Sequence, residues 1–300
     1  MTDLRTLLGL RDLVRRVKPD LVHTHSTKAG LLGRWAAALA GVPAVHTAHS
    51  WSFSDGVSSS RRALAVPVEA VTARLTRRII AVSDADREVA ERWHVARGER
   101  VTVVHNGVAD VPERAEPDAA GPPTLAMVAR LAPPKDHALL LHALGGLKDL
   151  PWRVALVGDG PGRATIEATV ARLGIADRVD LLGLRRDVPA VLARAHVGAL
   201  ISRQEGFPLA VLEAMRAGLP VIASDVGGAR EAVTAETGLL VARDDEAGLR
   251  DALRRVLSTP ALRRSLGDAG RRRYEERFTA AAMITRTLDV YAKAVGAVAR

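Results

Sequence analysis

The chain has 300 residues, of which 48 % are apolar and 26 % charged, a mixture typical of two folded domains and not of a disordered or fibrous chain. It contains no cysteine, which excludes disulfides, thiolate nucleophiles, zinc ribbons and iron–sulfur clusters. The net charge of +9 does not indicate nucleic acid, because the basic residues are scattered among Asp and Glu and only 3 % of residues are aromatic. Anionic membrane surfaces or phosphorylated substrates fit that charge better.

Short runs rich in Val, Ile and Ala alternate with amphipathic helical stretches, which predicts an α/β fold with parallel sheets. We expect ten strands, at Asp20–His23, Ala44–His49, Arg78–Val82, Val101–Val104, Leu125–Val128, Arg153–Val157, Val179–Leu182, Val197–Ile201, Pro220–Ala223 and Leu239–Val241. We expect helices at Leu4–Val17, Lys28–Ala40, Arg62–Thr76, Ala85–Trp93, His137–Lys148, Arg163–Leu173, Leu209–Ala217, Glu246–Leu257, Pro260–Arg277 and Ala280–Val298.

The periodicity is interrupted at Ala109–Pro123, where Pro, Ala and charged residues are typical of a linker. Ten strands are also too many for one ordinary sheet. We therefore expect two Rossmann-like domains, residues 1–108 and 109–279, with a final helix at 280–300 that packs back on the first domain. No apolar run approaches the ~20 residues of a membrane span, and the first residues do not resemble a signal peptide. These features predict a cytoplasmic protein, which could also attach peripherally to the inner face of a membrane.

Histidines follow two strands of the first domain, in HTHSTKAG (His23–Gly30) and HTAHSW (His46–Trp51). His23 and His25 share a face by strand alternation, which would permit a metal site. No third ligand is apparent, so we expect no metal. His25 fits either a structural role or a place beside the substrate.

The segment Arg61–Arg78 has basic ends and an apolar stripe at Leu64, Val68, Val71 and Leu75. Core packing explains the stripe, and a helix resting on an anionic bilayer is the alternative. Further along, Asp84 and Asp86 match a D-x-D pattern that can bind a divalent metal. The run SDAD from Ser83 is better explained as the cap of a helix.

In the second domain, the stretch SRQEGFPLAVLEAM begins at Ser202 and passes from a strand end into a helix. Gly206 and Phe207 form a tight turn, and Pro208 is expected at the first helical position. Together with Leu209 they present backbone N–H groups and the positive end of the helix dipole, which predicts an anion site.

Two carboxylates flank this turn, Glu205 and Glu213, and the helical rise separates them by about 12 Å. They could bind the hydroxyl-rich ends of an extended ligand whose phosphates lie between them. Taken singly, Glu205 is also explained as a capping residue and Glu213 as part of a solvated helix face.

Two further loops follow strands of the same domain and should reach the same sheet edge. The loop after Val128 carries Arg130 and Lys135, spaced by a Pro pair, and two permanent cations there can neutralise a pyrophosphate. The turn Val157-Gly-Asp-Gly-Pro161 supplies Gly158, which lets backbone approach a ligand closely.

These motifs together resemble the retaining glycosyltransferases of family 4, which have the GT-B fold. The stretch Glu205–Glu213, EGFPLAVLE, is similar to the family's E-x7-E donor motif. Arg130 and Lys135 match its phosphate-binding cations, and the run HNGV from His105 resembles its interdomain Asn-Gly turn. The HTHSTKAG segment resembles members that build capsular, exopolysaccharide or lipopolysaccharide glycans.

The resemblance implies transfer of a sugar from a UDP- or GDP-type nucleotide sugar to a glycan or lipid-linked acceptor, with retention of configuration and without a metal or other cofactor. Glu213 would bind the ribose, Arg130 and Lys135 the phosphates, and Glu205 with the Gly206 and Phe207 amides the sugar and β-phosphate. His49 matches the family's histidine near the reacting sugar, although Ser50 stands where Gly is usual.

Relative to the family, the first domain lacks an opening strand with a Gly-rich loop, so we expect an incomplete first domain and an unpaired edge at its first strand. A start codon assigned too late, a remnant gene, or a separate chain that supplies the missing half would each explain this. The alternatives to a transferase are a non-catalytic or split-subunit chain that binds nucleotide sugar, and a GT-B nucleotide-sugar epimerase.

Overall fold

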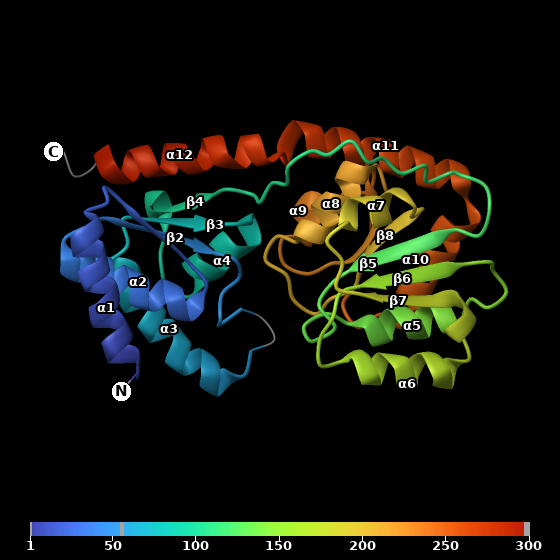
Figure 1. Ribbon diagram of the computed structural model, residues 1–300, viewed down its shortest axis with the longest axis horizontal. Coiled ribbons are helices and arrows are strands. Elements are labelled where there is room, and N and C mark those ends of the chain that lie inside the picture. The colour runs from blue at the N-terminus through green and yellow to red at the C-terminus, as the bar shows by residue number, and fades with distance from the viewer. Residues whose placement is uncertain (1, 55–56, 297–300) are drawn as a thin grey trace. The chain divides into compact units, whose positions relative to one another are not determined.

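The computed structural model describes residues 2–54 and 57–296 and divides into two compact units (Figure 1). Unit 1 contains the chain up to Asn106 together with the residues from Ala281 on, and unit 2 is Gly107–Ala280. The expected helix Ala280–Val298 is observed as Ala280–Gly296, and its last two expected residues lie outside the described part. Within that part, no helix is both long and apolar enough to cross a bilayer.

Unit 1 contains a parallel sheet of four strands in the order β1-β2-β3-β4. Its strands are β1 (Val22–His25), β2 (Ala44–Ala48), β3 (Arg78–Ala81) and β4 (Val101–Val103). Its helices are α1 (Thr2–Val17), α2 (Thr27–Ala40), α3 (Ser59–Arg74), α4 (Asp84–Arg92) and α12 (Ala280–Gly296). In the described part of the unit, β1 is an edge strand that pairs with β2 alone, as expected for the first strand.

Helices cover the two faces of this sheet, because successive strand residues point to opposite sides. Ile79 and Ala81 pack with the side of α3 that carries Ala73, whereas Ile80 packs with Val290 of α12. The last helix of the chain is therefore part of the unit 1 core.

The stripe on α3 does not pack in the core, and this prediction was wrong for three of its four residues. Leu64, Val68 and Val71 are 75 %, 50 % and 45 % exposed. The opposite face of α3 is buried instead, and there Glu69 forms a 2.5 Å ion pair with the fully buried Arg34 of α2. A charged residue occupies the core side because it has a buried partner, which the periodicity of apolar residues does not reveal.

The cap predicted at Ser83 is observed. The Ser83 hydroxyl accepts a hydrogen bond from the backbone N–H of Asp86 at 3.0 Å, and α4 begins at Asp84. Asp84 pairs with Arg87, one turn along the helix, at 2.8 Å. This geometry explains the D-x-D pattern as local helix chemistry.

Unit 2 contains a parallel sheet of six strands in the order β10-β9-β8-β5-β6-β7. Its strands are β5 (Thr124–Val128), β6 (Arg153–Val157), β7 (Val179–Gly183), β8 (Val197–Leu200), β9 (Val221–Ser224) and β10 (Gly238–Val241). Its helices are α5 (His137–Gly145), α6 (Arg163–Leu173), α7 (Val188–Ala193), α8 (Leu209–Ala217), α9 (Ala229–Ala232), α10 (Glu246–Ser258) and α11 (Pro260–Arg277). The short helices α7 and α9 were not predicted, because one or two turns carry too little periodicity to detect.

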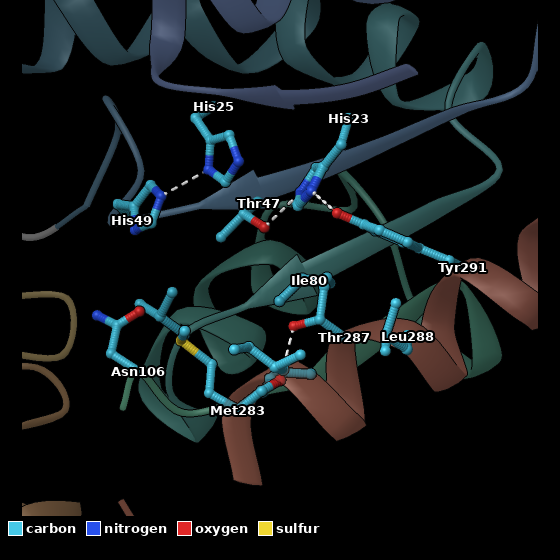
Figure 2. A pocket seen from close by; sticks show the side chains of 13 residues that line it. His23, His25, Thr47, His49, Ile80, Asn106, Met283, Thr287, Leu288 and Tyr291 are labelled. Carbon is cyan, nitrogen blue, oxygen red and sulfur yellow. Dashed lines mark hydrogen bonds between the residues drawn. The ribbon is translucent and has the colours of Figure 1, made fainter. Parts of the chain in front are cut away.

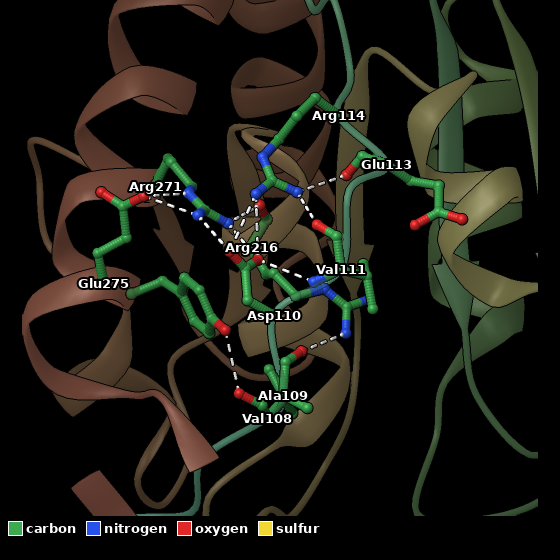
Figure 3. Close-up of polar contacts among 10 residues, drawn as sticks. Val108, Ala109, Asp110, Val111, Glu113, Arg114, Arg216, Arg271 and Glu275 are labelled. Carbon is green, nitrogen blue, oxygen red and sulfur yellow. Dashed lines mark hydrogen bonds and ion pairs between the residues drawn. The ribbon is translucent and has the colours of Figure 1, made fainter. Parts of the chain in front are cut away.

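A polar cluster on unit 2 joins the segment that follows Gly107 to the end of α11 (Figure 3). Asp110 forms paired 2.8 Å bonds with Arg271, which holds the pKa of the Asp110 carboxyl below its usual range. The Tyr274 hydroxyl donates to the Val108 carbonyl at 3.0 Å, and Arg216 donates to the Ala109 carbonyl at 3.1 Å. These bonds anchor the first residues of the linker to the body of unit 2.

Arginines also close helix ends and loops by bonding to backbone carbonyls. Arg263 is only 2 % exposed and donates to the Pro117 carbonyl of the linker and, at 3.0 Å each, to the carbonyls of Val256 and Leu257 at the end of α10. Arg62 in unit 1 similarly donates to three loop carbonyls. A planar guanidinium with five donors can serve several acceptors at once, which an ammonium does with less geometric precision.

Candidate functional site

Two loops of unit 2 lie side by side at the carboxyl ends of β5 and β8. The backbone N–H of Asp136 donates to the Ile201 carbonyl at 2.9 Å, and that of Arg203 donates to the Pro134 carbonyl at 2.9 Å. An isolated bridge also pairs Lys135 with Ser202. The two loops therefore form one structure, and the residues they carry are held against each other.

The pair that results is Lys135 with Glu205. The Lys135 ammonium donates to Glu205 Oε1, and the two side chains are only 21 % and 11 % exposed. Arg130, on the same loop as Lys135, is exposed and has no ion-pair partner among residues 2–54 and 57–296. The edge thus offers one cation already paired with a carboxylate and one available to solvent.

The glycine turn after β6 packs against this loop. Gly158 has φ +143°, and a Cβ there would overlap the Ala129 carbonyl oxygen. At Gly160 a Cβ would lie 2.6 Å from the Leu131 carbonyl oxygen. The close approach that these glycines permit is to the backbone flanking Arg130, so they fix the course of the cation-bearing loop.

Helix α8 begins at Leu209, and Pro208 is its N-cap residue and not its first helical residue as predicted. The reason is its ψ of 118°, which is extended and not helical. Phe207 is 4 % exposed and packs its ring 5.3 Å from that of Phe278, and the Gly206 carbonyl accepts from Gly228 N–H at 2.9 Å. The turn is therefore rigid, and no side chain in the described residues caps the helix.

Glu213 lies one turn into α8, between buried residues. It is half-buried, and burial raises the pKa of its carboxyl, an effect that nearby Arg216 partly offsets. A carboxylate held in such a place is poorly hydrated. It would gain from hydroxyl donors on a bound ligand.

A second group of polar residues lines a cavity of about 300 Å³ in unit 1 (Figure 2). His23, His25 and His49 come from the carboxyl ends of β1 and β2, and Tyr291 comes from α12. Thr47, Asn106 and Thr287 also line it, and the rest of the wall is apolar: Ile80, Val82, Val104, Met283, Ile284 and Leu288.

Hydrogen bonds connect the polar residues of this cavity (Figure 2). His25 Nδ1 lies 2.9 Å from His49 Nε2. The two nitrogens of His23 lie 2.5 Å from the Tyr291 hydroxyl and 2.8 Å from the Thr47 hydroxyl. The His23 and His25 rings are 4.3 Å apart, so the two hydrogen-bonded groups are in contact.

Burial and repulsion from the neighbouring histidines favour the neutral imidazole at His23 and at His49. Burial, with the charges of His25 and His49, lowers the pKa of His23 to about 4. Burial and His25 also lower the pKa of His49. Neutral imidazoles can both donate and accept hydrogen bonds, which suits them to hold or deprotonate a hydroxyl group.

The structure places the predicted site residues in two groups. Those in unit 2 gather at one edge of its sheet: Arg130, Lys135, Gly158, Glu205, Gly206, Phe207, Pro208, Leu209 and Glu213. His25 and His49 lie in unit 1 and are hydrogen-bonded to each other. Sequence reasoning missed Thr47 and Tyr291, which also line the cavity. The alternation of side chains along β2 could have predicted Thr47. No nearby sequence signal indicates Tyr291, which is 268 residues from His23.

Comparisons with known proteins agree with this architecture. The model of the family "Glycosyl transferases group 1" matches residues 112–273, and that of "Glycosyltransferase Family 4" matches residues 2–110. The chain is 32 % identical to the UDP-Gal:alpha-D-GlcNAc-diphosphoundecaprenol alpha-1,3-galactosyltransferase of Escherichia coli, over 87 % of this chain and 72 % of that protein. It is also 32 % identical to the D-inositol 3-phosphate glycosyltransferase of Saccharomonospora viridis, over 93 % of this chain and 71 % of that protein.

Among solved structures, the chain is similar to Alr3699/HepE of Anabaena, crystallised in complex with UDP and glucose. The TM-score is 0.84 at 22 % identity, with 95 % of this chain and 80 % of that chain covered. The fold is therefore GT-B, as the resemblance implied. Together with the matched family models and relatives, this shows that the chain is a glycosyltransferase and belongs to the family of glycosyl transferases group 1.

Proposed function

We propose that the chain transfers a sugar from a nucleotide-diphosphate sugar to a glycan or lipid-linked acceptor, with retention of configuration and without a metal ion. The observation that carries this proposal is the contact between Lys135 and Glu205, on the same sheet edge as Arg130, which forms no ion pair with any residue that the structure describes. Three charged groups at one sheet edge match the charges of a diphosphate and the hydroxyl groups of a sugar.

In this proposal the donor lies along the edge of the unit 2 sheet. Arg130 and Lys135 bind the two phosphates, and Glu213 binds the ribose hydroxyl groups. Glu205 and the amides of Gly206 and Phe207 bind the transferred sugar and the β-phosphate. The rigid turn packed on Phe278 supports this assignment, because amides held in place need no reorganisation when the anion arrives.

Catalysis in this scheme is electrostatic. As the bond between sugar and β-phosphate breaks, negative charge grows on the departing nucleotide, and Arg130, Lys135 and the α8 dipole stabilise it. Lys135 is already ordered by Glu205, so little side-chain entropy is lost when a phosphate joins the pair. Two permanent cations supply the charge that a divalent metal supplies in other transferases, which supports metal-independent transfer.

The acceptor is proposed to bind on the unit 1 side, near His25 and His49. Their mutual hydrogen bond orients both rings, and a neutral His49 can accept a hydrogen bond from a sugar or acceptor hydroxyl. The apolar wall of the cavity beneath them fits an acceptor that carries a non-sugar portion, as a lipid-linked glycan does.

The test compares Lys135→Ala and Glu213→Ala with the matched controls Lys148→Ala and Glu167→Ala, which lie elsewhere on unit 2. Binding of UDP- and GDP-sugars is measured by calorimetry, and transfer is measured with a diphosphate-linked glycan acceptor. We expect each site variant to reduce donor binding or transfer at least a hundredfold and each control to stay near wild type. Near-normal binding and transfer in both site variants would overturn the assignment.

Two further measurements check the finer parts of the proposal. Transfer should continue undiminished in excess chelator, and the anomeric configuration of the product, read by NMR, should equal that of the donor. Loss of transfer in chelator would refute metal independence, and an inverted product would refute retention. A wild-type chain that binds donor but neither hydrolyses nor transfers it would favour a binding protein.

A further inference from the structure

The outward face of α3 is apolar along most of its length. Between Arg61 and Arg74, its exposed positions carry no charged or polar side chain. They are Ala63, Leu64, Pro67, Val68 and Val71, and we call them the α3 face. The helix lies on the side of the sheet away from α12 (Figure 1).

Contacts on the other side of α3 keep this face outward. Glu69 is paired with the buried Arg34, and Trp35 of α2 donates to the Thr72 hydroxyl at 3.2 Å. Rotating α3 to bury Leu64 would break both contacts and expose a charge pair that now lies in the interior. The exposure of the α3 face is therefore imposed by the packing of unit 1.

A basic pocket lies at the carboxyl end of the same helix. It has a volume of about 320 Å³ and is lined by Arg74, Thr76, Arg77, Arg78, Arg100, Lys293 and Ala294. Arg100 is fixed by the carbonyls of Ala73 and Thr76, and Arg78 forms a 4.0 Å pair with Glu99. Arg74, Arg77 and Lys293 are exposed, and none has an ion pair among the described residues.

We propose that the α3 face and the basic pocket together bind the surface of an anionic phospholipid bilayer. Leu64, Val68 and Val71 would enter the boundary between headgroups and acyl chains, and the basic pocket would take a headgroup phosphate. Arg74 lines the basic pocket and lies one helical turn after Val71 of the α3 face, so the apolar and basic contacts are continuous.

Charge favours a membrane over a second copy of this chain as the partner. Both ends of the α3 face are basic, at Arg61 and at Arg74 with Arg77. Pairing two such faces about a two-fold axis would place cations against cations. An anionic bilayer supplies the opposite charge along the whole surface, together with an apolar interior.

The test measures co-sedimentation of the full chain with phosphatidylcholine vesicles that do or do not contain phosphatidylglycerol, in the absence of donor and acceptor. We expect binding to the anionic vesicles only. Because no sugar transfer is involved, the result is independent of the donor site and of the proposed activity.

Two variants with matched controls locate the contact. Leu64→Glu is compared with Leu184→Glu, a leucine of unit 2 that is 84 % exposed. Arg74→Glu with Arg77→Glu is compared with Arg272→Glu on α11, which also removes positive charge from an exposed helix site. Each lost cation should weaken partitioning about fivefold, so the double variant should lose ~25-fold or more. Leu64→Glu should lose at least tenfold, and both controls should stay within about fivefold of wild type.

Binding is compared only among variants whose thermal unfolding shows that they fold like the wild type. Equal binding to both kinds of vesicle, or equal losses in site and control variants, would overturn the proposal. So would sedimentation equilibrium showing a dimer that Leu64→Glu dissociates, since the α3 face would then be an interface between copies. If Leu64→Glu fails to fold, the exposed Arg74 and Arg77 substitutions still decide the question.

Discussion

Replacing Glu69 by alanine should strongly destabilise unit 1. The pair that Glu69 forms with Arg34 is 2.5 Å long, and the two side chains are 8 % and 0 % exposed. Without the carboxylate, the Arg34 guanidinium keeps the 3.0 Å bond from Nε to the Gly30 carbonyl, and its NH2 nitrogen already has no partner among the described residues. The variant therefore leaves a buried charge with one hydrogen bond.

The expected loss is about 3 to 5 kcal/mol, because the desolvation cost of the remaining charge is no longer offset. For a unit of this size that corresponds to a fall in Tm of roughly 10 to 20 °C. Urea unfolding followed by far-UV circular dichroism measures it, and tryptophan fluorescence adds a local signal from Trp35, which bonds to α3 beside the pair. If Glu69→Ala does not fold, Glu69→Gln, which keeps one acceptor, provides a milder form of the same change.

The matched control is Glu167→Ala in unit 2. Glu167 also pairs with an arginine, Arg163, at 2.9 Å, but the two side chains are 50 % and 41 % exposed. Its loss should cost no more than about 0.5 kcal/mol. The double variant Arg34→Met with Glu69→Leu should recover most of the stability, since it removes both charges. Equal losses for Glu69→Ala and Glu167→Ala would refute the argument that burial sets the value of the pair.

Two other predictions concern strain and pH. Ser26 has φ 61° and ψ 165°, a region suited to glycine, and caps no N–H of α2, so Ser26→Gly should stabilise the protein by about 1 kcal/mol in urea unfolding whereas Ser26→Ala should not. Burial, and after it the charges of Arg34 and the other histidines, lower the pKa of His46 from 6.5 to about 3. The folded state therefore favours neutral His46, and the stability that this provides is complete above pH 6.5 and is lost as the pH falls toward 3. Between pH 7 and pH 5 the free energy of unfolding should fall by about 2 kcal/mol because of His46. The variant His46→Gln should lack this part of the fall, and an equal fall in the variant and the wild type would show that His46 is not its source.

The repetitive elements of the fold could be predicted from the sequence because their signals are local. All ten strands were placed within a few residues. The loops that carry Arg130, Gly158 and Glu205 could be placed at one sheet edge, because each directly follows a strand of one parallel sheet. Some strand boundaries differ from the prediction by a few residues, because the residue types at strand ends do not define where pairing begins. The first strand, for example, was expected at Asp20–His23 and lies at Val22–His25.

Contacts between distant segments could not be predicted in this way. Nothing near Tyr291 indicates that it meets His23, and nothing near Asp110 indicates Arg271, 161 residues away. The same limit explains why the prediction buried the wrong face of α3. Its inner face contains Glu69 and small residues and appears polar, and only the pairing with Arg34 makes that face the buried one.

The bonding of arginines to carbonyls changes what the basic isoelectric point of about 10.8 means. A guanidinium that bonds to a neutral carbonyl keeps its full positive charge, so Arg62 and Arg263 make the chain more basic while they close loops and helix ends. Much of the excess positive charge is therefore carried by arginines whose role is to hold loops and helix ends. Their hydrogen bonds to neutral carbonyls lose little strength in salt. Where cations gather without such acceptors, as Arg74 and Arg77 do, the charge remains free to attract a partner.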